Sequence, residues 1–392
     1  MDALHTTHNV SAAQHCNEDV LLHIFRYPSR RGDLAVAARV CRAWLYPARS
    51  MLYGRITCNF NSFTVSLLDQ TLSTCEHLRT LIRHLRVQCD WPQPTFDSNF
   101  SWIAHLPAQK LRSIEFMFFR NIECPNIIFA SPAVSAVQKA VIRSRSTSKM
   151  LDAVLHMPQL TSLSLTVSNS TGDRCVIERN LKLRRLTIAA MALDLPDLVF
   201  NIVNAIDPAC TLERFDLIAS ATISAANVPV LLGALERHLP NLKHLCLGSL
   251  SQFCGPKEPF MDDLVKHLPS VQTLYCGYGT YTTALITRLP PTLHTLGLIW
   301  GSQESILTTG TFSWAEIDWS LARHNVRFPC EDYAAAITRL GADGGGCGLQ
   351  KLVLVRSGLV QDDYTALEQA CRAARINFEV AGMIGCYTIL MD

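Results

Sequence analysis

The sequence lacks the features that mark secreted, membrane-spanning or strongly charged proteins. Its 15 cysteines are an odd number and form no C-x-x-C pair, so neither a disulfide framework nor a zinc ribbon is indicated. There is no run of about 18 apolar residues, and Met1 to Gln14 show no cationic start followed by an apolar stretch. The formal net charge is only +2, too small to favour nucleic acid or an anionic membrane as the main partner. We therefore expect a cytoplasmic or nuclear protein with reduced thiols.

Motifs that carry catalysis are missing as well. No G-x-S-x-G elbow occurs, and the glycine run at 344–348 lacks the lysine and hydroxyl residue of a phosphate-binding loop. His244 and Cys246 form a lone pair without further ligands at metal spacing. The sequence thus indicates no catalytic residue, no metal site and no cofactor, and we expect a protein that is not an enzyme.

Near the N-terminus, the sequence predicts three short helices. Asn17 is placed to cap the first helix, and the third is expected from about Arg42 to Gly54. Apolar residues recur in these helices at the spacing of a helical face, and they include Val20, Leu21, Ile24, Phe25, Leu34, Val40 and Trp44. A unit this small buries too little surface to be very stable alone.

From about residue 80, a repeated phrase places apolar residues at its first, fourth and sixth positions. The clearest copies begin at Leu160, Leu183, Leu212, Leu242, Leu293 and Leu349. Between Ile82 and Leu293, counting weaker copies, the phrases begin 22 to 30 residues apart, which is the period of solenoid repeats. The end of each phrase alternates like a short strand, and an amphipathic helix precedes many of the phrases, for example from Tyr281 to Leu289.

Each repeat of helix, turn and strand can hide its apolar face only against its neighbours. We therefore expect an α/β fold in which the N-terminal helices are followed by a curved stack, with an inner parallel sheet and an outer layer of helices. A doubly wound α/β domain is the alternative. The repeated period and the absence of a glycine-rich phosphate turn after the first strand disfavour it.

These patterns divide the chain into three parts: a disordered N-terminus at 1–15, a helical domain at 16–56 and a repeat domain at 57–392. The interval from Leu293 to Leu349 is 56 residues, about twice the repeat period. We therefore expect an insertion or a degenerate unit at about 300–330. Its aromatic residues include Trp314 and Trp319, which are either a satellite core or an exposed anchor.

The segment 16–56 resembles the F-box, the module by which substrate receptors attach to the Skp adaptor of cullin-RING ubiquitin ligases. The resemblance is carried by Asp19-Val20-Leu21, Ile24-Phe25, Asp33-Leu34 and Val40-Cys41-Arg42-x-Trp44. The later phrases resemble leucine-rich repeats in their longer, helix-bearing form, which often follow an F-box. The consensus asparagine of such repeats is replaced here by Ser168, Met191, Ser220, Leu250 and Ser357. We therefore expect the ladder of hydrogen bonds to the sheet carbonyls to be different or irregular.

The resemblance implies a non-catalytic substrate receptor of an SCF-type ligase, with the Skp adaptor, and through it cullin, bound at the F-box and an unknown protein target bound at the repeats. The implied adaptor contacts are Val20, Leu21, Ile24, Phe25, Leu34, Val40, Cys41 and Trp44. For each of them, packing inside the helical unit is the alternative. For the whole chain, the alternatives are a repeat scaffold with a non-functional F-box, and an α/β enzyme without a recognisable centre.

Charge in the same segment is unbalanced. Residues 17–55 contain seven arginines and three acidic residues, so an acidic adaptor surface is attracted to it. A solvated polar face is the alternative interpretation.

Overall fold

The structure of the chain is a computed structural model. It describes residues 16–27, 31–59, 64–89, 101–118, 126–144, 148–167, 177, 180–190, 195–219, 228–249, 259–277, 279–300, 328–342, 348–356 and 363–382. Several sequence predictions lie outside these residues. They are the disordered N-terminus at 1–15, most of the insertion at about 300–330 with Trp314 and Trp319, the glycine run at 344–347, and the positions of the missing consensus asparagines.

Three helices open the described chain, as predicted, and they are α1 (Glu18–Ile24), α2 (Arg31–Ala37) and α3 (Arg42–Gly54). The strands that follow are β1 (Arg55–Asn59), β2 (His84–Cys89), β3 (Ser113–Phe118), β4 (Lys139–Ser144), β5 (Ser162–Val167), β6 (Arg185–Ala190), β7 (Arg214–Ala219), β8 (His244–Ser249), β9 (Thr273–Cys276), β10 (Thr295–Trp300), β11 (Lys351–Arg356) and β12 (Asn377–Gly382). Within the described residues these strands form one 12-stranded sheet in chain order. Neighbouring strands run parallel from β1 to β3 and from β5 to β12.

Helices separate the strands. They are α4 (Thr64–Thr74), α5 (Glu76–Arg79), α7 (Ser101–Ala104), α8 (Asn126–Phe129), α9 (Ser148–Leu155), α10 (Leu195–Asn204), α11 (Val228–Leu235), α12 (Met261–Leu264), α14 (Cys330–Ala342) and α15 (Thr365–Ala373). Short 3-10 helices are η2 (Pro132–Ala136), η3 (Leu239–Asn241), η4 (Val265–His267) and η5 (Thr283–Arg288). The predicted fold class, a helical N-terminal unit followed by an α/β stack on a parallel sheet, is confirmed.

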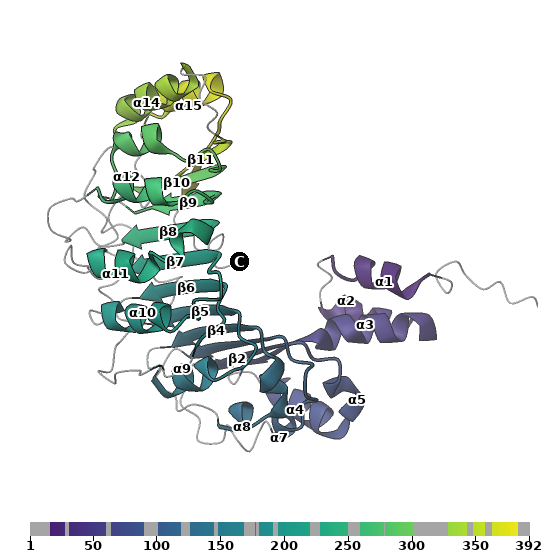
Figure 1. Cartoon of the computed structure of the whole chain (residues 1–392). Coiled ribbons are helices and arrows are strands. Elements are labelled where there is room, and N and C mark those ends of the chain that lie inside the picture. The colour runs from purple at the N-terminus through teal and green to yellow at the C-terminus, as the bar shows by residue number, and fades with distance from the viewer. Residues whose placement is uncertain are drawn as a thin grey trace, which may run out of the picture. The chain divides into compact units, whose positions relative to one another are not determined.

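The chain divides into two compact units. The first comprises residues 1–118, 122–139 and 157–159, and the second comprises the remainder. The first unit holds α1 to α5 and the strands β1 to β3, and the second holds β5 to β12. In the second unit, α10, α11 and α12 lie along one face of the strands (Figure 1).

The repeated phrase explains this layered arrangement. Its fourth position is in register across the second unit, with Leu186 beside Phe215, and Leu245 beside Leu274. All four side chains are buried. Because alternate residues of a strand point to opposite faces, the sixth position joins the fourth in one continuous core. Burial of each such side chain contributes roughly 1.5–3 kcal/mol.

At most of the described strand entries, a backbone carbonyl accepts two hydrogen bonds. The carbonyl of Arg184 accepts from the N–H groups of Glu213 (2.8 Å) and Arg214 (3.1 Å), and that of Glu213 accepts from Lys243 (2.8 Å) and His244 (3.0 Å). The arrangement continues along the sheet, with further acceptors Arg83, Arg112, Thr161, Lys243, Gln272 and His294. Backbone groups alone therefore build a regular ladder at this edge of the sheet.

Where the sequence predicts a helix from Tyr281 to Leu289, the structure has only the 3-10 helix η5. Thr282, Thr283, Ile286 and Thr287 are β-branched, and such residues lose side-chain freedom in an α-helix. A short 3-10 turn also fits the small space between two strands.

Arg237 and His238, which follow α11, connect this repeat to the preceding one. Nη2 of Arg237 donates to the carbonyls of Val203, Asn204 and Ile206, each at 3.0 Å, and these lie at and just beyond the C-terminal end of α10. Its Nε donates to Nε2 of His238 at 3.1 Å, so the imidazole accepts there and is neutral. His238 is 2% exposed. Burial, with the charge of Arg237 as the smaller cause, lowers its pKa from 6.5 to about 4.

This histidine predicts a pH dependence of stability. Between pH 6.5 and about 4, the unfolded chain binds a proton at His238 and the folded chain does not, so the free energy of unfolding falls as the pH decreases. Above pH 6.5 the neutral His238 makes its full contribution to the free energy of unfolding. At a pH of about 4 the free energy of unfolding is lower by about 3 kcal/mol. Urea denaturation across this range should show a clearly weaker pH dependence for His238→Gln than for the parent. Parallel curves for the two proteins would show that the histidine is not responsible.

Candidate functional site

The helices α1 to α3 pack around a small core of their own. Its buried members are Leu21, Phe25, Leu34, Ala37 and Ala48. Trp44 packs against this core, with its ring edge-on to that of Phe25 at a centroid distance of 5.5 Å. As predicted, Asn17 caps α1, because its side-chain oxygen accepts from the N–H of Asp19 at 3.1 Å.

Helix α1 is apolar on two sides. Leu21 and Phe25 point into the core, whereas Val20 and Ile24, each one residue earlier, are 47% and 50% exposed. A helix at the surface of a small unit normally has one apolar stripe and one polar face. The second stripe of α1 is therefore not explained by packing within the unit, and it is available to a partner.

More apolar side chains are exposed on the same three-helix unit. We define its apolar surface as the exposed residues Val20, Ile24, Tyr27, Val36, Val40 and Tyr46. The described residues contain nine exposed large hydrophobic side chains in all, and six of them belong to this surface. The other three, Leu67, Val230 and Val380, occur singly on α4, α11 and β12. Scattered apolar residues are common on protein surfaces, but such a concentration marks an interaction site.

Of the eight predicted adaptor contacts, the structure places three in the apolar surface and three in the core. The exposed residues are Val20, Ile24 and Val40, and the core residues are Leu21, Phe25 and Leu34. The remaining two, Cys41 and Trp44, are half-buried where α2 meets α3. Contact with an adaptor stays a prediction for all eight residues. The core members hold the helices in place, so their influence on a partner would be indirect.

Sequence reasoning missed Tyr27, Val36 and Tyr46 as candidate contacts. Tyr27 could have been found, because it follows Val20 and Ile24 at the spacing of one helical stripe. Val36 lies between the buried Leu34 and Ala37 on a short helix, and spacing alone does not tell which of these residues faces inward.

Basic side chains are adjacent in sequence to residues of the apolar surface. Arg26, Arg39 and Arg42 are exposed on or beside the three helices. Arg31 donates to the backbone carbonyl of Arg55 at 3.1 Å, so one end of α2 is tied to the start of β1. Exposed arginines beside an apolar centre are typical of the polar rim of a protein interface.

The described part of the chain gives no sign of a metal or thiol centre. No group of three or more His, Cys, Asp or Glu side chains there could hold a metal ion. Burial raises the pKa of the Cys58 thiol to about 12 and that of Cys371 to about 11, so these thiols stay protonated and are poor nucleophiles. Among the same residues, no helix has the length and apolar character needed to span a bilayer.

A helical unit with a concentrated apolar surface, followed by an α/β repeat sheet, defines a protein built for interactions. Comparison with known families supports this class, because the family described as F-box-like matches residues 18–59. No curated protein matches the sequence. Among solved structures, the chain is similar to the leucine-rich repeat-containing protein LegL7 from Legionella pneumophila, with 12% sequence identity, a TM-score of 0.39, and coverage of 81% of this chain and 89% of that one. The protein combines an F-box-like domain with a leucine-rich-repeat-like C-terminal region.

Proposed function

We propose that this protein is a substrate receptor of an SCF-type cullin-RING ubiquitin ligase. F-box domains typically bind the Skp adaptor. In this proposal, the F-box-like domain binds the adaptor and through it cullin, and the repeats bind a protein target. The observation that carries the proposal is the concentration of exposed apolar side chains in the part of the chain that matches the F-box-like family.

The apolar surface suits this role energetically. Its six side chains are 47–65% exposed, so a partner that covers them removes a substantial apolar area from water, at roughly 25 cal/mol per Å². The exposed arginines around it add attraction to an acidic adaptor, which accelerates encounter more than it strengthens the complex.

The receptor itself catalyses nothing in this proposal. It holds the target near the ligase, and other subunits transfer ubiquitin in the cytoplasm or nucleus. We place the functional boundary near residue 56. Helix α3 ends at Gly54 and β1 begins at Arg55, so no linker separates the adaptor-binding unit from the first strand.

Affinity purification tests the proposal against the alternative of a repeat scaffold with a non-functional F-box. We expect the tagged chain to recover both adaptor and cullin, and deletion of residues 17–55 to abolish their recovery while target proteins are retained. Failure of the intact chain to recover adaptor and cullin, or equal recovery after the deletion, would leave the scaffold as the correct interpretation.

A further inference from the structure

The entries of the first four strands carry a concentration of basic residues. The two residues at each entry are Gly54-Arg55, Arg83-His84, Arg112-Ser113 and Gln138-Lys139. Five of these eight residues are basic and none is acidic. We define the basic surface as Arg55, Arg83, His84, Arg112 and Lys139. All of its members belong to the first compact unit.

The backbone places the members of the basic surface side by side. Arg55 is in register with His84, and His84 with Ser113. On the next strand, the N–H of Lys139 donates to the carbonyl of Arg112 at 3.1 Å. The second residue of each of these strands is buried in the core, so the first residue points to the opposite face. From β1 to β4 the surface crosses three strand spacings, which is about 14 Å at about 4.8 Å per spacing.

Three of the positive charges act on the ring of His84. Burial is the main cause of the lowered pKa of this histidine, and the charges of Arg55, Arg83 and Lys139 lower the pKa further. Among the described residues, no acidic side chain acts on the ring in the opposite direction. Nδ1 of His84 lies 2.7 Å from the hydroxyl oxygen of Ser113, which holds the ring in place. Positive charges from the entries of β1, β2 and β4 therefore converge on one place.

The basic surface lacks the acidic partners that basic side chains have elsewhere on the same strands. Nε of Arg86 on β2 lies 2.6 Å from Oε2 of Glu115 on β3. In the part of the chain that the structure describes, no ion pair joins Arg55, Arg112 or Lys139 to an acidic residue. These three side chains are exposed. Like charges on neighbouring strands repel one another, so an anionic partner would stabilise this part of the sheet.

The extent of the basic surface favours an extended acidic peptide segment over a single phosphate group. A phosphate group reaches side chains on adjacent strands, whereas the basic surface extends over four strands. Side chains on one face of an extended peptide recur every second residue, about 6.8 Å apart. Acidic residues at the first, third and fifth positions therefore span about 14 Å, the same length as the surface from β1 to β4. Nucleic acid is disfavoured by the small net charge of +2.

We propose that the basic surface binds an extended acidic segment of a target protein, with carboxylates at alternate residues. The two end carboxylates of the segment pair with Arg55 and Lys139, and the central one lies near His84. The assignment of the segment to a target rests on the proposed function. The binding of an acidic peptide does not require the adaptor, so the two proposals can be tested separately.

Fluorescence anisotropy of labelled peptides tests the chemistry of the partner on the purified full-length chain. The probe contains Glu-Ser-Glu-Ser-Glu between glycine-serine flanks. One control peptide contains Ser-Glu-Glu-Glu-Ser, and a second has glutamine in place of each glutamate. We expect the probe to bind at least about threefold more tightly than the contiguous control, which can present fewer carboxylates to one face. The glutamine peptide should not bind, and the affinity of the probe should fall as salt increases.

The same assay contains the outcomes that would overturn the proposal. Equal affinity for the alternating and contiguous glutamate peptides would mean that the strand spacing does not select the segment. Tighter binding of a peptide with a single phosphoserine, or of a single-stranded oligonucleotide, would identify a different partner.

Charge reversal locates the binding site. Arg55 and Lys139 are exposed, so the fold tolerates their replacement, and Arg55→Glu/Lys139→Glu should weaken probe binding at least about tenfold. The matched control is Arg184→Glu/Arg185→Glu, which changes the net charge equally at the entry of β6 in the second unit. This control should change the affinity by less than about twofold, since exposed charges are screened beyond a Debye length.

The variants also separate this inference from unfolding and from the proposed function. Equal losses in the two charge-reversal variants, or unchanged affinity of Arg55→Glu/Lys139→Glu, would contradict the proposal. If that variant loses its circular dichroism, the milder Arg55→Gln/Lys139→Gln decides, with an expected loss of about threefold. Recovery of adaptor and cullin without probe binding would refute this inference alone. Probe binding without their recovery would refute the proposed function alone.

Discussion

The double substitution Val20→Asp/Ile24→Asp should reduce adaptor binding by at least about 100-fold. Both side chains are about half exposed on the second stripe of α1, so the free protein tolerates the carboxylates in water. At an apolar interface the same carboxylates would be buried without partners, at a cost of several kcal/mol. The dissociation constant of the purified chain for purified Skp adaptor, measured by calorimetry, gives the effect directly.

A matched control is available on the repeats. Val230 on α11 is 54% exposed, close to Ile24 at 50%, and Val230→Asp should leave adaptor affinity unchanged. Aspartate at Phe25 is unsuitable, because Phe25 is in the core of the helical unit and its substitution would report unfolding. If the double variant bound with parental affinity while retaining its helical circular dichroism, the apolar surface would not be the adaptor site.

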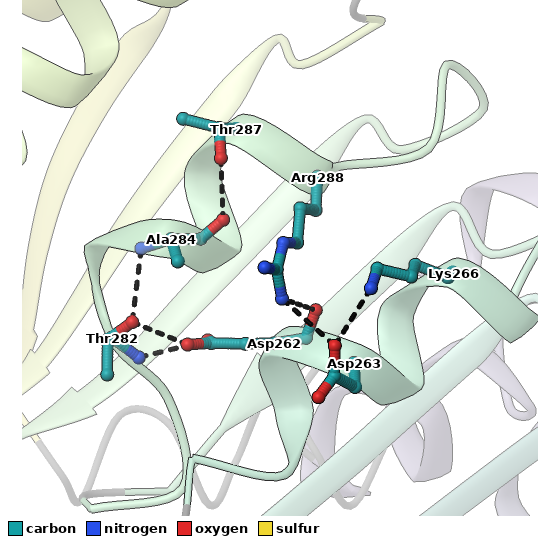
Figure 2. A network of polar contacts seen from close by, with 7 residues as sticks. All are labelled: Asp262, Asp263, Lys266, Thr282, Ala284, Thr287 and Arg288. Atoms are coloured by element: carbon teal, nitrogen blue, oxygen red, sulfur yellow. Dashed lines mark hydrogen bonds and ion pairs between the residues drawn. The ribbon is translucent and has the colours of Figure 1, made fainter.

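The second large effect is expected at Asp262, where Asp262→Ala should lower the free energy of unfolding by about 2 kcal/mol. Asp262 is 5% exposed, and its carboxylate accepts from both the N–H group and the hydroxyl of Thr282 (Figure 2). Oγ1 of Thr282 in turn accepts from the N–H of Ala284 at 3.1 Å and caps η5. Without the carboxylate, the hydroxyl and the N–H group of Thr282 both lose their acceptor, and the buried space of the Asp262 side chain is left unfilled. Urea denaturation measures the difference.

The neighbouring residue is the control for this prediction. Asp263 accepts from Lys266 at 2.8 Å and from Arg288 at 3.0 Å (Figure 2), but its side chain is 75% exposed. Ion pairs of this kind contribute little, and Asp263→Ala should change stability by less than about 1 kcal/mol. Equal losses for Asp262→Ala and Asp263→Ala would mean that burial does not distinguish the two carboxylates.

The layered fold could be predicted from the sequence because each repeat carries the same signal. Leucines at the fourth and sixth positions are buried in strand after strand, as Leu245 and Leu247 illustrate, because stacked repeats cover one another's apolar faces. Helix type was harder to predict. The segment from Tyr281 to Leu289 has the apolar spacing of a helix, yet its β-branched residues and the short connection allow only the 3-10 helix η5.

The candidate site was only partly predictable. Spacing identified the apolar residues of α1, but it did not separate Leu21, which supports the unit from within, from Val20, which is exposed. That distinction depends on where α2 and α3 pack, and thus on contacts distant in sequence. The buried side chains of β6 to β12 that alternate with the leucine-rich core, such as Ala189 and Ile218, follow no motif either. Tyr275 and Ile299 are ordinary strand residues, and only their burial in the folded chain sets them apart.

Hydrogen exchange of the full-length chain, with and without purified Skp adaptor, is the most direct test of the central claim. We predict that the adaptor slows amide exchange in α1, α2 and the first turns of α3, where Val20, Ile24, Val36, Val40 and Tyr46 lie, and leaves the strands β4 to β12 unchanged. Unchanged exchange in these helices at saturating adaptor, or protection confined to the repeats, would contradict the account.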